Sequence, residues 1–207
     1  MASKVDIANR ALSMLGEARI ISLTDNNKPA RAMNARFDLL RDAELTAYPW
    51  RFAVKRAQLA ASTEVPSWGY SVIYERPTDD LKLIRVGGAN ISAEAVGVMY
   101  SATGYSSEAA PYEVIEGKIH TDLSAPLDYE YISRVTDTGQ FDPLFVEALA
   151  SRLAADAAEE LTQSKAKKEA ALYTYDRAIS TAKRNNALMR PPRMREPGRW
   201  MSSRIVG

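Results

Sequence analysis

The chain has 207 residues, of which 46% are hydrophobic and 26% charged, which is enough for one domain with a real core and a polar surface. It contains no cysteine, which excludes disulfide frameworks, thiolate zinc sites and cysteine nucleophiles. The N-terminus lacks the apolar run of a signal peptide, and no stretch approaches the roughly 18 apolar residues of a membrane span, so we expect a non-exported protein that contacts no membrane.

The net charge of +1 hides an uneven distribution along the chain. Residues 183–207 carry seven Lys and Arg side chains and one acid, whereas the first 182 residues carry 20 basic and 25 acidic side chains. A basic C-terminal segment beside an acidic remainder favours an arm that contacts an acidic surface or nucleic acid.

Two helices are expected near the N-terminus. The first spans residues 4–16, repeats apolar residues at helical spacing and ends at Gly16. The loop that follows carries Ile20, Ile21 and Leu23, so we expect it to pack against the core.

The second helix is expected to start after Asn26 or Asn27, with Pro29 in its first turn, and to end before Pro49. One of its faces mixes acids and bases, which we interpret as a solvated surface with local ion pairs. The side chains of that face are Arg31, Arg36, Asp38, Arg41 and Asp42.

After residue 50 the pattern changes to short extended segments. The strand candidates are residues 52–59, 70–74, 81–86, 94–101, 112–115, 118–121 and 127–135. Residues 76–80 predict a turn, and Glu116 with Gly117 predicts a hairpin. The middle third is therefore expected to form a small antiparallel β module.

Two longer helices are expected next, over residues 142–186. Asp142 is a good N-cap with Pro143 in the first turn, and Ser164 caps the second helix. Each helix of about 20 residues would be roughly 30 Å long. That length is typical of a scaffold that packs against neighbours.

The second long helix is expected to end at Asn186, because residues 190–197 contain three prolines and cannot continue it. The segment is interpreted as an extended basic arm that becomes ordered on a partner. Its cationic and apolar candidate contact residues are Arg190, Arg193, Arg195, Arg199, Trp200, Met201, Arg204 and Ile205.

Together these elements predict an α+β fold. Antiparallel helices form a bundle from residues 1–50 and 141–186, the β module over 51–140 is inserted between the two helix pairs, and the arm occupies 187–207.

Residues that carry chemistry are sparse. The sole histidine, His120, lies in a predicted strand and is interpreted as a hairpin residue, because one histidine without cysteine makes a metal site improbable. Gly87 and Gly88 lack the spacing of a phosphate-binding loop. The acid pairs at 79–80 and 159–160 are better explained as turn residues and solvent-exposed side chains than as a general acid and a general base. We expect no enzyme, no cofactor and no metal.

Five segments in order resemble the tail tubular protein A family, the head-to-tail adaptors of short-tailed bacteriophages and related prophages. They are LGEARIISLTD (15–25) with a helix ending in YPWRF (48–52), YERPTDDLKLIRV (74–86), YEVIEGKIHTD (112–122), DYEYISRVTD (128–137) and FDPLFVEALA (141–150). The resemblance covers roughly residues 5–185, and the segment beyond Arg190 is where least can be transferred.

The resemblance implies a structural virion protein at the head–tail junction, assembled in the host cytoplasm. Such adaptors form a ring, commonly of twelve subunits, beneath the portal protein, and they extend the channel for packaged double-stranded DNA. The β region would face the tail nozzle or tail tube protein, and the basic arm would bind the portal.

Two other function classes stay open from the sequence. The first is a nucleic-acid-binding protein that uses the basic arm on phosphates, with affinity that falls steeply as salt rises. The second is a tail-associated polysaccharide hydrolase, which would need a pair of carboxylates that the sequence does not nominate.

Overall fold

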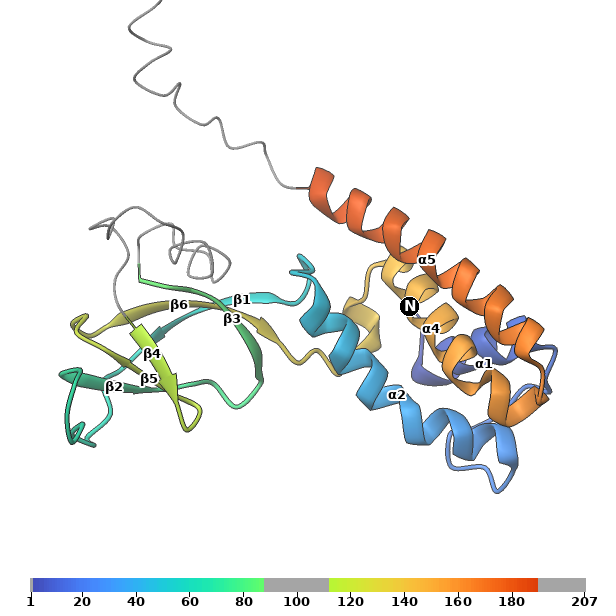
Figure 1. Cartoon of the computed structure of the whole chain (residues 1–207), viewed down its shortest axis with the longest axis horizontal. Helices are drawn as coiled ribbons and strands as arrows, with labels where there is room; N and C mark the ends of the chain where they lie inside the picture. Colours follow the sequence, from blue (N-terminus) through green and yellow to red (C-terminus); the bar gives the residue numbers. More distant parts are fainter. Residues whose placement is uncertain (1, 88–111, 190–207) are drawn as a thin grey trace, which may run out of the picture.

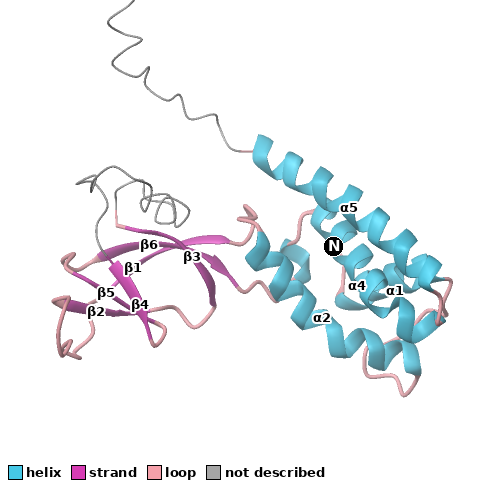
Figure 2. Cartoon of the chain, in the orientation of Figure 1, coloured by secondary structure: helices cyan, strands magenta, loops and turns pink. Residues whose placement is uncertain are grey.

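The computed structural model describes residues 2–87 and 112–189 (Figure 1). These residues form an α+β fold with four α-helices and two three-stranded antiparallel sheets, as Figure 2 shows by colour. The helices are α1 (Lys4–Leu15), α2 (Lys28–Ala47), α4 (Pro143–Thr162) and α5 (Lys165–Leu188), with a short 3-10 turn η1 (Thr138–Gln140) before α4. The strands are β1 (Val54–Leu59), β2 (Val72–Glu75), β3 (Asp80–Val86), β4 (Tyr112–Ile115), β5 (Lys118–Thr121) and β6 (Leu127–Ser133).

The helix ends follow the local rules read from the sequence. Asn27, Asp142 and Ser164 each accept a backbone hydrogen bond from the first turn of their helix. Gly16 closes α1 in the left-handed conformation, which a residue without Cβ adopts at least cost. α5 ends at Leu188, two residues beyond the predicted end at Asn186.

All four helices contribute to one hydrophobic core. α4 lies at its centre and buries ten residues, including Phe145, Leu149 and Leu153. α5 folds back along α4 after a two-residue connection (Figure 1). It buries only Ala171, Ile179 and Ala182 along its 24 residues, so most of its surface remains open.

The six strands of the described residues lie between α2 and α4 in the sequence, and they form two antiparallel sheets, a division that the sequence analysis did not specify. The first sheet has the order β1-β6-β3 and the second the order β2-β5-β4. A smaller core of Tyr74, Val86, Ile119, Leu127, Tyr129 and Tyr131 holds them together. The chain order does not reveal this division, because the β1 residues pair with β6 residues that follow them by 68 to 78 positions.

The β4–β5 hairpin lies where the sequence places it. Glu116 and Gly117 both have positive φ, at 51° and 78°, which is the two-residue turn that suits the twist of paired strands. The predicted strand at 94–101 and Gly88 lie outside the described residues.

The loop between α1 and α2 is packed down only in part. Ile20 is buried and its backbone is held by both polar atoms of the Asn9 side chain. Ile21, in contrast, is 91% exposed, so the expectation that the whole loop faces the core is wrong for this side chain.

Among residues 2–87 and 112–189, no helix has both the length and the apolar character that crossing a membrane requires.

Candidate functional site: the helix–strand joint and the outer face of α5

Aromatic side chains fill the joint between the helices and the strands. The ring of Phe145 on α4 lies 5.0 Å from Trp50, 5.1 Å from Phe52 and 5.1 Å from Phe141, centroid to centroid. The indole N–H of Trp50 donates to the carbonyl of Glu44 at 2.8 Å. Aromatic pairs at this spacing add to the stabilisation that comes from burial alone. The joint is therefore an anchored, apolar connection rather than a flexible link.

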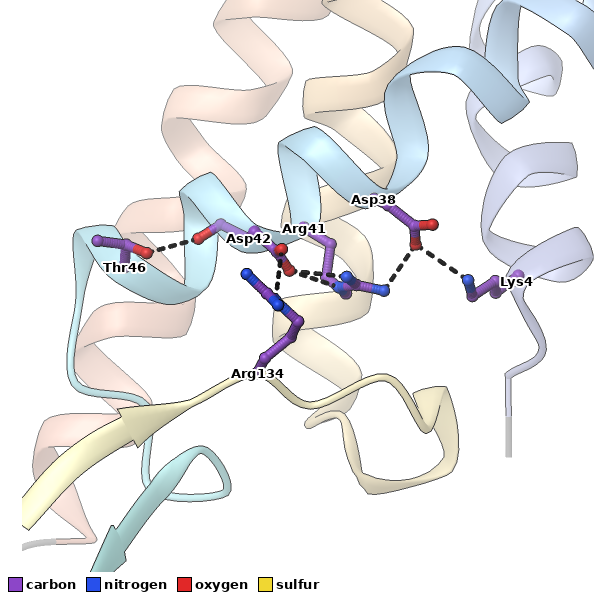
Figure 3. Close-up of polar contacts among 6 residues, drawn as sticks. All are labelled: Lys4, Asp38, Arg41, Asp42, Thr46 and Arg134. Carbon is purple, nitrogen blue, oxygen red and sulfur yellow. Dashed lines mark hydrogen bonds and ion pairs between the residues drawn. The ribbon is translucent and has the colours of Figure 1, made fainter. Parts of the chain in front are cut away.

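A chain of ion pairs links α1, α2 and the segment that follows β6 (Figure 3). Lys4 of α1 binds Asp38 of α2 at 2.9 Å, and Arg41 binds both Asp38 at 2.6 Å and Asp42 at 2.8 Å. Arg134, which follows β6, binds the other oxygen of Asp42 at 2.9 Å. The chain thereby ties α1, α2 and the connection out of the β region to one another.

The interpretation of this α2 face as solvated is wrong for Arg41, whose side chain is only 4% exposed. Asp38 and Asp42 of this face instead neutralise the buried Arg41 guanidinium, because a buried charge is costly unless it is paired. Arg36 is also half-buried and reaches across to Asp156 at 2.8 Å and Glu160 at 2.5 Å on α4. The hydrogen bond from Lys4 lowers the pKa of Asp38 below its usual value, so this carboxylate stays charged to a lower pH than an ordinary aspartate.

Arg134 continues the connection into the strands. Its backbone N–H donates to the carbonyl of Asp79 at 2.6 Å. The Asp79 carboxylate accepts from Lys55 of β1 at 2.7 Å and from the Tyr131 hydroxyl of β6 at 2.9 Å. The turn before β3 is thus fixed to β1 and β6.

Asp80 corrects the expectation that the 79–80 acid pair lies on a wet face. Its side chain is 1% exposed and accepts from Arg76 at 2.8 Å and from the Tyr129 hydroxyl. Its second oxygen, Oδ1, is buried and has no hydrogen-bond partner within the described part of the chain. The rings of Tyr129 and Tyr131 stack with their centroids 5.4 Å apart, so the two side chains pack against each other on the strand.

We expect the stability of the β region to depend on pH in the alkaline range. Burial, together with the hydrogen bond to Asp79, raises the pKa of Tyr131 to about 12. Because this lies above the ordinary tyrosine value of about 10, the contribution of protonated Tyr131 is complete below that ordinary value. It is lost as the pH rises through about 12. Denaturant unfolding at several pH values should show a steeper alkaline loss for the natural chain than for Tyr131→Phe, and equal slopes would contradict the assignment.

Polar contacts help to attach α5 to the rest of the protein, beside the apolar side chains that it packs against the core. The Tyr175 hydroxyl donates to the buried Glu44 carboxylate at 2.7 Å, and burial raises the pKa of Tyr175 well above its usual range. Lys167 donates to the carbonyl of Leu15 at 2.7 Å. Near the end of the helix, Asn186 accepts from the backbone N–H of Arg51 at 2.9 Å. These contacts fix the helix in register while its outer side stays uncovered.

The outer face of α5 is basic and partly apolar. Tyr173, Arg177, Arg184 and Leu188 are all exposed, and their spacing places them on one side of the helix. The Arg177 guanidinium lies over the Tyr173 ring at 5.9 Å. α5 carries six Lys and Arg side chains against two acids, a net charge of +4. Such a face is suited to an acidic partner.

The other polar residues that could have carried chemistry each have a position or contact that the fold explains. His120 lies in β5 opposite Ile73, and Ser164 caps α5. Glu159 binds Lys168 at 2.6 Å, and Asp122 accepts from the N–H and hydroxyl of Ser71. Within residues 2–87 and 112–189, no three metal-ligating side chains gather closely enough to hold an ion.

The predicted arm contacts lie outside the described residues. These are Arg190, Arg193, Arg195, Arg199, Trp200, Met201, Arg204 and Ile205. Among the described residues, the structure shows three features that the sequence analysis did not predict: the burial of Arg41, the burial of Asp80 and the exposed basic face of α5. Arg41 and Asp80 carry no sequence signal for their burial, whereas the outer face of α5 could have been found from the spacing of Tyr173, Arg177, Arg184 and Leu188.

No protein-family model matches the chain. No curated protein matches it in a sequence search either.

Proposed function

We propose that the chain is a ring-forming head-to-tail adaptor of a short-tailed bacteriophage or related prophage. The observation that carries the proposal is the run of five segments whose order resembles the tail tubular protein A family. Three of these segments contribute to features of the joint: residues 48–52 supply the aromatic turn, residues 74–86 the Asp79–Asp80 turn, and residues 128–137 most of β6 and Arg134, which follows it.

The proposed adaptor works through two units and an arm. The helices of residues 1–50 and 141–186 act as one antiparallel bundle, and residues 51–140 act as an inserted β module. The joint at Arg41, Phe145 and Arg134 sets the direction of the β module relative to the helices. Residues 190–207, beyond the end of α5, form the arm that binds the portal.

In this role the helices stand side by side around a ring, commonly of twelve subunits, beneath the portal protein. The β module faces the tail nozzle or tail tube protein, and packaged double-stranded DNA passes through the channel. The protein acts structurally rather than catalytically, at the head–tail junction of the virion after assembly in the host cytoplasm.

Native mass spectrometry of the purified chain, alone and mixed with the portal protein of the same phage, tests this function. We expect stable complexes that contain a whole ring of adaptor subunits on a portal ring. A chain that remains monomeric and never joins the portal would contradict the proposal.

Removing residues 190–207 is expected to leave the helices folded and to stop incorporation into portal complexes. α5 ends at Leu188, so the truncation removes no residue of the helix. Circular dichroism checks the folding, and the portal-binding assay above checks incorporation. A truncated chain that assembles normally would show that the arm is not the portal contact.

DNA binding is the second candidate function, favoured by the net charge of +4 on α5 and by the basic arm that follows it. Its affinity should fall by roughly 0.9 log units per log unit of salt for each phosphate neutralised. If the truncation of residues 190–207 leaves DNA binding unchanged and abolishes portal binding, the hypothesis that the arm binds DNA is contradicted.

A further inference from the structure

The loop between β1 and β2 is braced at both of its ends. The backbone N–H of Ser62 donates to the carbonyl of Ile73 at 2.8 Å, which fixes the start of the loop to β2. At the other end, the N–H and the hydroxyl of Ser71 both donate to Asp122 Oδ1 at 2.9 Å, just after β5. Because the loop is hydrogen-bonded to the second sheet at both ends, it has less conformational freedom to lose when a partner binds it.

The middle of this loop, in contrast, exposes large apolar side chains. Val65 is 86% exposed and Trp68 is 85% exposed, whereas Trp50 in the joint is 1% exposed. Tryptophan is among the residues that contribute most to binding when an interface covers them. We refer to residues 62–71 as the Trp68 loop. Its braced ends and uncovered apolar centre suit insertion into an apolar socket of a partner.

The surface around the Trp68 loop is acidic. Glu64 of the loop and Glu75 of β2 both bind one cation, Lys118 of the β4–β5 hairpin. Residues 62–75 and 112–122 together carry five acids and one lysine, a net charge of −4 with the histidine neutral. Such a surface repels the phosphates of nucleic acids and attracts Lys and Arg side chains. The charge therefore favours a protein partner with a basic rim over DNA.

The position of the Trp68 loop keeps it clear of the helices. The β2-β5-β4 sheet, to which the loop is bound, lies at the end of the protein away from the four helices (Figure 1). In the proposed ring the helices of neighbouring copies stand side by side, so this end remains open to another protein. Each copy then presents one such loop, and several loops that engage one assembly together bind it more tightly than a single loop does.

We propose that the Trp68 loop is the contact by which the adaptor binds the tail nozzle or tail tube protein. The Trp68 and Val65 side chains enter an apolar socket of that protein, and Lys or Arg side chains around the socket face the acids of the second sheet. This inference rests on the proposed adaptor function. It names the adaptor residues that make the tail contact and the chemistry of the surface that they recognise.

Titration of the portal-bound adaptor with the purified tail nozzle or tail tube protein of the same phage tests the contact. Trp68→Ala should lower the affinity for the tail protein by roughly 30-fold or more, because every copy loses the side chain that fills the socket. The variant should still form portal-bound rings and should unfold at the same urea concentration as the natural chain, since the side chain is 85% exposed. Leu39→Ala on α2 is the matched control: it removes another apolar side chain, 74% exposed, and should leave the tail affinity unchanged.

Charge reversal gives an independent readout on the same complex. Glu113→Lys, at an exposed position of β4, changes the net charge of the acidic surface from −4 to −2. It should slow association with the tail protein and weaken the dependence of the association rate on salt, whereas the dissociation rate should change little. Glu169→Lys makes the same charge change at an exposed position of α5 and should alter neither rate.

The outcomes separate this contact from the adaptor function. Portal-bound rings in which Trp68→Ala binds the tail protein as tightly as the natural chain does would overturn the contact and leave the adaptor function standing. Loss of the rings themselves in Trp68→Ala would assign the loop to a neighbouring copy, and DNA binding that the same variant weakens would assign it to nucleic acid; either result would also overturn the contact. Tail binding that depends on Trp68 in a chain that never joins the portal would support the contact and contradict the adaptor.

Discussion

Replacing Phe145 with alanine is expected to lower the free energy of unfolding by about 3–5 kcal/mol. Phe145 is fully buried and touches Trp50, Phe52 and Phe141, which come from segments on both sides of the strands. The truncation would therefore leave a cavity where the helices meet the β region. The surrounding rings are fixed by their own contacts, so only a part of that cavity can close.

Urea unfolding followed by far-ultraviolet circular dichroism measures this loss. Leu172→Ala is the matched control, because it removes an apolar side chain of α5 that is 39% exposed, and it should cost less than about 1 kcal/mol. A Phe145→Ala variant within about 1 kcal/mol of the natural chain would show that the aromatic cluster does not hold the joint.

Replacing Arg41 with methionine is expected to cost about 1.5–3 kcal/mol, the range for losing hydrogen bonds to charged groups. The side chain keeps a similar length but leaves Asp38 and Asp42 facing each other without the guanidinium between them. Lys4 and Arg134 still neutralise the two acids from outside, which keeps the loss from being larger.

Arg31→Met on the same helix provides the control for Arg41, because Arg31 is exposed and its guanidinium donates to the Asn26 side chain. It should change the free energy of unfolding by less than about 0.5 kcal/mol. Amide hydrogen exchange adds a local readout, since the Arg41 change should speed exchange at residues 134–137. Equal effects of the two substitutions would contradict the role of Arg41.

The elements that the sequence predicts well are those set by neighbours in the chain. Asn27, Asp142 and Ser164 cap their helices through contacts within three residues, and the hairpin at 116–117 needs only its own backbone. Local rules are sufficient for such features. The α+β class follows from them, because four helical stretches flank a series of short strands.

The features that the sequence missed depend on residues far apart in the chain. Arg134 meets Asp42 across 92 positions, and Tyr129 meets Asp80 across 49. A charge pattern on one helix cannot show whether a distant segment covers it, so Arg41 looked solvated and Asp80 looked like a turn residue. The division into two sheets has the same origin, since β6 joins β1 and β3 through pairing that is not local.

A cryo-electron reconstruction of the chain bound to the portal of the same phage tests the central claim most directly. We expect a closed ring of adaptor copies beneath the portal, with the four helices side by side around the channel and the two sheets directed toward the tail. A portal with no ring of this chain beneath it, or with single copies scattered over its surface, would contradict the proposed function.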